Sequence, residues 1–242
     1  MLPFLLAGVI YHFSTIFTNA HGVARSSGRL YAEGSSYRLE LDPTTTARDF
    51  DVAISRDGDV TAVLLNNARR KYHDRVRVSS KTRSSILFQF PFPGGEPVGR
   101  PIVLHREEAT EMVAGHPAKK HVITVEYRLR AEDDDGTPIN ALVHAVQTIW
   151  CAEDLPRLPF ERELMTGWMV VDRELKPVTS SLTGMTLGSE LVVTRTFEGG
   201  PPIMETTRTT VDDLRVEPVS ASMFAVPADF VYDRAPMAPR RQ

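Results

Sequence analysis

The segment from Lys119 to Trp150 constrains the fold more than any other part of this chain. It holds two long runs of alternating apolar and polar residues, HVITVEYRL and INALVHAVQTIW, separated by the acidic stretch AEDDDGTP. Alternation with a period of two, rich in β-branched residues, is typical of strands with one buried face, and Asp-Gly followed by Pro is a turn signal. The segment therefore predicts an antiparallel hairpin with long arms, which suits a wide, curved sheet.

Strand-like alternation recurs along most of the chain, and no linker divides it. The predicted strands are Val9–Thr18, Tyr37–Leu41, Phe50–Ile54, Val60–Leu65, Ser85–Phe92, Pro101–Ala114, Thr166–Asp172, Leu191–Phe197, Ile203–Val216 and Ser222–Val226. Asn66–Lys81 is polar and irregular, with room for one short helix, and Phe160–Met165 is a second short helical candidate. Roughly ten to twelve strands in one twisted antiparallel sheet must curl to hide an apolar face, which predicts a half-barrel or barrel with helical segments over its mouth.

Composition excludes several classes of protein. The chain has 242 residues, 42% of them apolar, which suffices for a core but is too low for a membrane protein. Lys and Arg number 28 against 31 Asp and Glu, so the basic footprint of a nucleic-acid binder is missing, and the basic run Arg69–Arg83 is interpreted as a solvated face. Cys151 is the one cysteine, so neither an intrachain disulfide nor a cysteine-based zinc site can form.

The N-terminus has two interpretations. MLPFLLAGVIYHFSTIFTNA is apolar like a signal peptide, but no Lys or Arg precedes the apolar run. Val9, Tyr11, Phe13 and Phe17 share one face at a period of two, so we predict the first strand there. Residues 1–8 are then the remnant of an export leader whose true start lies upstream, or a disordered end. No later segment approaches the ~20 apolar residues of a membrane span.

The chain carries no catalytic or cofactor motif. The glycine-rich phosphate loops, GxSxG and HExxH are all missing, so no catalytic residue and no cofactor are predicted. His116 and His121, with His144 across the hairpin, are the best metal candidates, but isolated strand histidines are usually surface or core residues, and no metal is predicted. The acidic pairs Glu198/Glu205 and Asp212/Asp213 are interpreted as exposed faces.

The remaining signal is a surplus of apolar side chains on both faces of several strands. The insertion Leu155–Met165 adds more, and such a segment can cover the concave side of a curved sheet, leaving either a filled core or a ligand cavity. Side chains chosen by size and position as lining such a cavity are Tyr127, Leu129, Val143, Trp150, Phe160 and Met165.

The order of these features resembles a known pattern. GRLYAEGSSYRLEL is followed by a strand pair around an Asp-Gly turn, AGHPAKKHVITVEYRL, a long strand ending in Trp150, a Pro-rich insertion, a hairpin around GGPP and a closing F-x-V-P at Phe224–Pro227. With this order of features, the chain resembles, from Val9 to Tyr232, the uncharacterised bacterial exported domains that share the LolA/LolB lipoprotein-carrier half-barrel. The resemblance implies a half-barrel of about eleven antiparallel strands, with a few short helices over a concave face that receives acyl chains in LolA-like carriers. No ligand-handling residue of the carriers matches here, and the lipoprotein cysteine is missing.

Three hypotheses follow. The first is a non-enzymatic, periplasmic or otherwise exported protein, with one domain at 9–232 and a disordered tail at 233–242, that binds a lipid or another hydrophobic ligand. The second is a structural or interaction module of the cell envelope with a filled core, which meets a protein partner through its sheet edges or Arg69–Arg83. The third is a hydrolase whose site leaves no motif.

Overall fold

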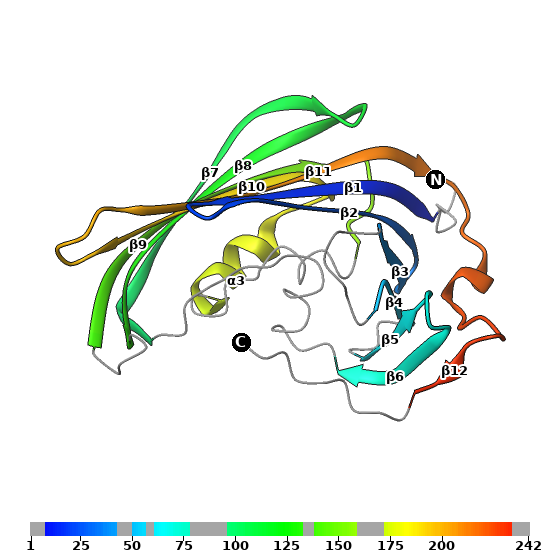
Figure 1. Cartoon of the computed structure of the whole chain (residues 1–242). Coiled ribbons are helices and arrows are strands. Elements are labelled where there is room, and N and C mark those ends of the chain that lie inside the picture. Colours follow the sequence, from blue (N-terminus) through cyan, green and yellow to red (C-terminus); the bar gives the residue numbers. More distant parts are fainter. Residues whose placement is uncertain are drawn as a thin grey trace. The chain divides into compact units, whose positions relative to one another are not determined.

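A computed structural model describes residues 8–42, 50–56, 61–77, 96–132, 138–158 and 172–233 of the chain (Figure 1). Several predictions lie outside these residues. They are the strand at Ser85–Phe92, the strand from Thr166 up to residue 171, the helix at Phe160–Met165, the leader at 1–7 and the tail from 234 onward.

Twelve strands of the described residues form one hydrogen-bonded sheet in the order β12-β6-β5-β4-β3-β2-β1-β11-β10-β9-β8-β7. β12 pairs with β6 in parallel, whereas the long hairpins β8/β9 and β10/β11 are antiparallel. The order has two ends, β12 and β7, so the sheet is open, as a half-barrel requires. A mainly β protein built on a single antiparallel sheet is therefore confirmed. The strands are β1 (Val9–Asn19), β2 (Gly22–Glu33), β3 (Ser36–Leu41), β4 (Val52–Ser55), β5 (Thr61–Asn66), β6 (Lys71–Arg77), β7 (Glu96–Val113), β8 (His116–Glu132), β9 (Pro138–Ala152), β10 (Met185–Phe197), β11 (Ile203–Val216) and β12 (Val231–Tyr232).

The predicted long hairpin is present as β8 and β9. Its pairing is continuous, from Ala118 opposite Ala152, through Tyr127 opposite Val143, to Glu132 opposite Pro138. The side chains of β9 alternate between buried and more exposed along the whole strand. Since successive side chains of a strand point to opposite faces, this alternation means that one face of the hairpin is covered and the other meets solvent.

The chain divides into two compact units. Unit 1 holds the described residues within Met1–Phe13, Ser26–Ser79 and Asp212–Gln242. Its core packs one face of the short strands β4 and β5 against the segment that follows β11, which contains the 3-10 helix η1 (Ala221–Phe224). The buried members of this core are Val52, Ile54, Leu65, Val219 and Phe224.

Unit 2 holds the described residues within Ser14–Arg25 and Ser80–Val211. Its core lies on one face of β8, β9 and β10, and the α-helix α3 (Asp172–Ser181) packs on that face (Figure 1). The helix contributes Leu175 and Val178 to the core, and Leu182 follows just after its last turn.

Two local predictions were wrong and one helix was missed. Within Asn66–Lys81, residues Lys71–Arg77 form β6, because pairing with β5 outweighs a run rich in charged side chains. Ser222–Val226 forms no strand: η1 begins there, and Ser220 accepts a hydrogen bond from the Ser222 backbone N–H as its cap. The sequence of α3, DRELKPVTSS, contains Pro177 and few apolar residues, so its helical periodicity is weak.

Candidate functional site

One extended apolar surface in the described residues is the covered face of the unit 2 sheet. Every second residue of three long neighbouring strands points there, and the strands carry β-branched and aromatic residues at those positions. The side chains on this face are nearly fully buried, so they are shielded from water. Its members on the strands are Ile123, Val125, Tyr127, Leu129, Val143, Ala145, Ile149, Cys151, Leu191 and Val193.

The helix over this face is attached at its C-terminal end. Arg157, just after β9, donates hydrogen bonds from its guanidinium group to the carbonyl oxygens of Thr179, at 3.0 Å, and Leu182, at 2.7 Å. The last carbonyls of a helix have no partners within the helix, and a cation next to them is favourable. Arg157 therefore fixes where α3 ends on the sheet, while Leu175 and Val178 supply its apolar contact.

The structure brings together three of the six ligand-lining candidates. Tyr127 of β8 lies directly opposite Val143 of β9, and Leu129 follows on the same face, all three buried within the unit 2 core. Trp150 lies on the opposite face: its indole Nε1 donates to Glu111 Oε2 at 3.2 Å, and the Lys120 Nζ atom lies 5.9 Å from its ring centre. Phe160 and Met165 lie outside the described residues.

A buried ion pair borders the apolar face, and the sequence interpretation missed it. Arg195 of β10 lies opposite Val143 and forms an ion pair with Glu205 of β11, with side chains only 11% and 13% exposed. Glu205 is thus not on an exposed face as predicted. The pairing of β10 with β11 around the Gly199–Gly200 turn places the two residues diagonally across the hairpin, which is the signal that could have found them.

The same ion pair affects the nearby tyrosine. Burial raises the pKa of the Tyr127 hydroxyl, and the positive charge of Arg195 opposes that rise. Beyond the ion pair, threonine hydroxyl groups lie on the buried side of unit 2. Thr207 and Thr209 of β11 are buried, and Thr15 Oγ1 lies 3.0 Å from Thr209 Oγ1. The face therefore changes from apolar on β8–β10 to polar on β11 and β1, an arrangement that suits an amphipathic molecule.

The three histidines considered for a metal are not brought together. His116 Nδ1 lies 2.8 Å from Asp154 Oδ2, whereas the ring of His121 contacts His105 of β7. His144 is exposed on the other face of β9, opposite Glu126. Within the described ranges, no group of three or more His, Cys, Asp or Glu side chains could hold a metal ion.

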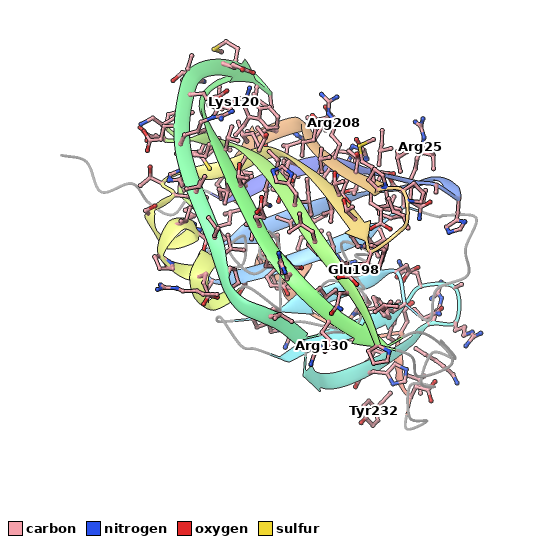
Figure 2. The ribbon with its side chains drawn as sticks, turned by 90° about the vertical axis from the view of Figure 1, so that its left-hand side faces the viewer. Arg25, Lys120, Arg130, Glu198, Arg208 and Tyr232 are labelled. Carbon is pink, nitrogen blue, oxygen red and sulfur yellow. The ribbon has the colours of Figure 1, made fainter. Side chains whose placement is uncertain are left out.

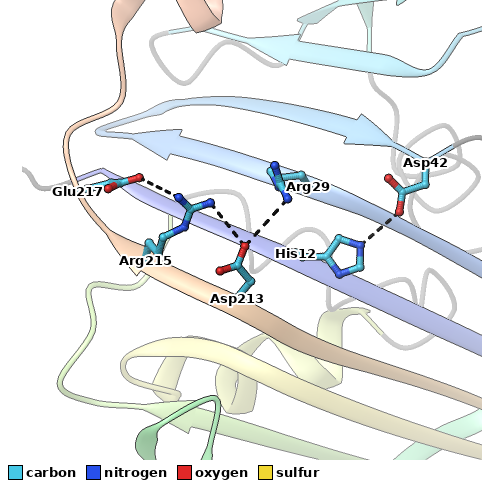
Figure 3. A network of polar contacts seen from close by, with 6 residues as sticks. All are labelled: His12, Arg29, Asp42, Asp213, Arg215 and Glu217. Atoms are coloured by element: carbon cyan, nitrogen blue, oxygen red, sulfur yellow. Dashed lines mark hydrogen bonds and ion pairs between the residues drawn. The ribbon is translucent and has the colours of Figure 1, made fainter.

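Unit 1 contains a serine, a histidine and an aspartate in contact, the residue types of a hydrolase triad. Which of the three contacts which decides whether they could act as one. Ser27 Oγ donates to Asp42 Oδ2 at 2.6 Å, and His12 Nε2 lies 3.2 Å from the same oxygen (Figure 3). In a catalytic triad the serine contacts the histidine, which removes its proton. Here both residues contact the aspartate, so the contact that would activate the serine is not made.

The other polar contacts in Figure 3 are exposed ion pairs. Asp213 lies 4.0 Å from Arg29 and 3.5 Å from Arg215, whose second nitrogen lies 3.5 Å from Glu217. Their side chains are about half exposed, so the charges are solvated and the contacts contribute little. Figure 2 shows Lys120, Arg130 and Arg208 among the side chains that the strands of unit 2 present to solvent.

Comparison with known proteins gives likenesses of structure. No protein-family model and no curated protein matches the chain. Among solved structures it is similar to a Vibrio parahaemolyticus domain named for outer membrane lipoprotein sorting, with 12% identity, coverage of 90% of this chain and 89% of that one, and a TM-score of 0.33. A DUF1329 family protein from Desulfovibrio piger shows 7% identity, coverage of 92% and 91%, and a TM-score of 0.37.

A third similar structure is lipovitellin, with 7% identity, a TM-score of 0.30, and coverage of 90% of this chain but 26% of that one. Since all three TM-scores lie below 0.5, the function has to be argued from the residues of this chain.

None of the described helices is long and apolar enough to cross a membrane. The one α-helix among the described residues, α3, has ten residues and an internal proline.

Proposed function

We propose that this chain is a non-enzymatic, exported protein that binds a lipid or another acyl-chain ligand reversibly on the apolar face of unit 2. The observation that carries the proposal is the composition of that face. Three long adjacent strands present a largely apolar surface, with the buried Gln147 among its members, and the ten-residue helix α3 packs on it.

A helix of this length is a weak cover. Isolated helices shorter than about 12–15 residues are marginal in water, and an internal proline removes a backbone hydrogen bond. The docking of α3 therefore depends on its apolar contacts, chiefly Leu175, and on the Arg157 hydrogen bonds. A ligand that offers the sheet a larger apolar surface can displace such a helix, because burial gives about 0.8 kcal/mol for each methylene group.

The polar border of the face suits the other end of such a ligand. Tyr127, Leu129 and Val143 form its apolar part next to the Arg195–Glu205 pair, so an acyl chain would lie over the first three with its polar end towards the pair. Trp150, on the opposite face, would then belong to a separate contact surface. A proposed partner protein of the cell envelope would deliver or receive the ligand.

The test compares two leucine-to-alanine variants by titration with a fluorescent fatty acid. Leu175→Ala weakens the docking of α3, so we expect tighter binding, by about tenfold for each 1.4 kcal/mol of docking energy removed. Leu65→Ala removes an equally buried leucine from the unit 1 core and should leave the affinity unchanged. Weaker binding by Leu175→Ala would mean that α3 contacts the ligand instead of competing with it. Equal affinities in both variants and the wild type would contradict ligand binding on the apolar face of unit 2.

A second measurement identifies the ligand class. Native mass spectra of the protein purified from a bacterial periplasm, followed by organic extraction, should show a defined adduct that extracts as lipid. A clean mass that stays unchanged after incubation with membranes would favour the envelope module with a filled core.

A further inference from the structure

Two imidazole rings meet across β7 and β8, next to Ile123 on the apolar face of unit 2. His105 Nε2 lies 3.2 Å from His121 Nδ1, with ring centres 5.4 Å apart and ring planes inclined by 25°. The ring planes are thus nearly parallel, and the two facing nitrogens lie within the distance of an N–H···N hydrogen bond. Such a bond needs one nitrogen with a proton and one without, so it fails when both nitrogens carry protons.

The two histidines differ in their surroundings. His121 is only 3% exposed, and its second nitrogen, Nε2, is buried with no hydrogen-bond partner among the described residues. His105 lies on the outermost strand and is exposed. A charged His121 would place a positive ring and an Nε2–H without an acceptor in a buried position, so burial opposes its protonation.

The charged groups around the pair partly cancel. Burial is the main cause that lowers the pKa of His121, and the charges of His105 and Lys119 lower it further, whereas Glu107 and Glu153 raise it. Glu107 is itself paired with Lys119 at 2.7 Å. The helix α3, which also contacts this region, adds the apolar side chains Leu175 and Val178 to the same face.

The pair lies where separation of the strands is easiest. β7 is the last strand in the sheet order, so β8 is its one neighbour in the described sheet. Its pairing with β8 is regular from Ile102 to Glu107 and shifts register on both sides of that stretch. Residues 102–107 are therefore held in the sheet mainly by their backbone hydrogen bonds to β8.

We propose that His105 and His121 form a pH-sensitive clasp between β7 and β8, closed while one of the two facing nitrogens lacks a proton and open when both carry one. The folded state favours neutral His121, so the unfolded state binds more protons and the clasp is strongest above the ordinary histidine pKa. It is lost as the pH falls through the lowered pKa of His121.

The experiment is a pH titration of the full, ¹⁵N-labelled chain. Imidazole ¹H–¹⁵N spectra should show His121 taking up its proton below the ordinary histidine pKa. Backbone hydrogen exchange should report opening of residues 102–107 that rises about tenfold for each pH unit below the His121 transition. The strand β9, which is paired on both sides by β8 and β10, should stay protected over the same range.

Two exposed-histidine variants complete the test. His105→Asn removes the facing charge, so the extra opening of residues 102–107 at low pH should disappear. His144→Asn, on the other face of β9, should keep it. An ordinary pKa for His121, a pH dependence that persists in His105→Asn, or an equal loss of protection in β9 would overturn the clasp.

Discussion

The cores of the two units are covered in different ways. In unit 1, short strands pack against the segment that follows β11, and side chains attach that segment to the strands. Arg56 Nε donates to the Phe224 carbonyl at 2.5 Å, and Arg38 donates to the Met223 carbonyl at 3.2 Å. In unit 2, much longer strands pack against α3, and Arg157 donates two hydrogen bonds to carbonyl oxygens at the C-terminal end of this helix.

This difference indicates which unit can exchange its cover. The segment over unit 1 is also held by ion pairs from Arg70 to Asp229 and from Lys71 to Asp233, and by the parallel pairing of β12 with β6. To expose that core, all of these contacts must break together. The cover of the unit 2 face includes one short helix with an internal proline, and we propose that the ligand exchanges with this helix.

The largest expected effect comes from two matched core substitutions, Ile54→Ala in unit 1 and Ile123→Ala in unit 2. Both isoleucine side chains are at most 1% exposed. The free energy of unfolding, measured with urea, should therefore fall by about 2–5 kcal/mol in each variant. Saturating fatty acid should stabilise Ile54→Ala as much as the wild type, and Ile123→Ala by a different amount. The same increment in all three proteins would contradict a ligand face in unit 2.

A smaller effect separates buried from exposed ion pairs. Glu205→Gln leaves the Arg195 guanidinium without its charged partner in a largely buried position, so we expect a loss of about 1.5–3 kcal/mol. Asp229→Asn breaks a pair whose side chains are more than half exposed, and its cost should be about 0–1 kcal/mol. Chemical unfolding of both variants measures the difference, and equal costs would contradict the burial of Arg195 and Glu205.

The smallest effect concerns the Asp42 carboxyl in unit 1. The hydrogen bond from Ser27 lowers its pKa, and His12 lowers it further against the opposing effect of burial. A lowered carboxyl pKa stabilises the fold above the ordinary pKa, and this contribution is lost as the pH falls through the folded value. In Ser27→Ala the pKa of Asp42, followed by carboxyl ¹³C NMR, should rise towards the ordinary value, and an unchanged pKa would assign the shift to His12 and Arg29.

The hairpin β8/β9 shows how far the sequence could lead. Its alternation places Tyr127, Leu129 and Val143 on one face without any tertiary information, because the period of a strand is fixed by its backbone geometry. By the same alternation, Trp150 falls opposite to Val143, so choosing all four as lining residues relied on size more than on strand geometry. The mainly β class and the first strand at Val9 were likewise predictable from local pattern.

The sequence by itself determined most of the strands, the face that most of them bury and the long hairpins, since these depend on neighbours within a few residues. Only the tertiary structure decided which groups far apart in the chain meet. β6 is a strand because β5 offers it a ladder, and Arg195 and Glu205 are buried because their strands lie next to an apolar face. His105 contacts His121 only because β7 and β8 pair in one particular register, which no local pattern specifies.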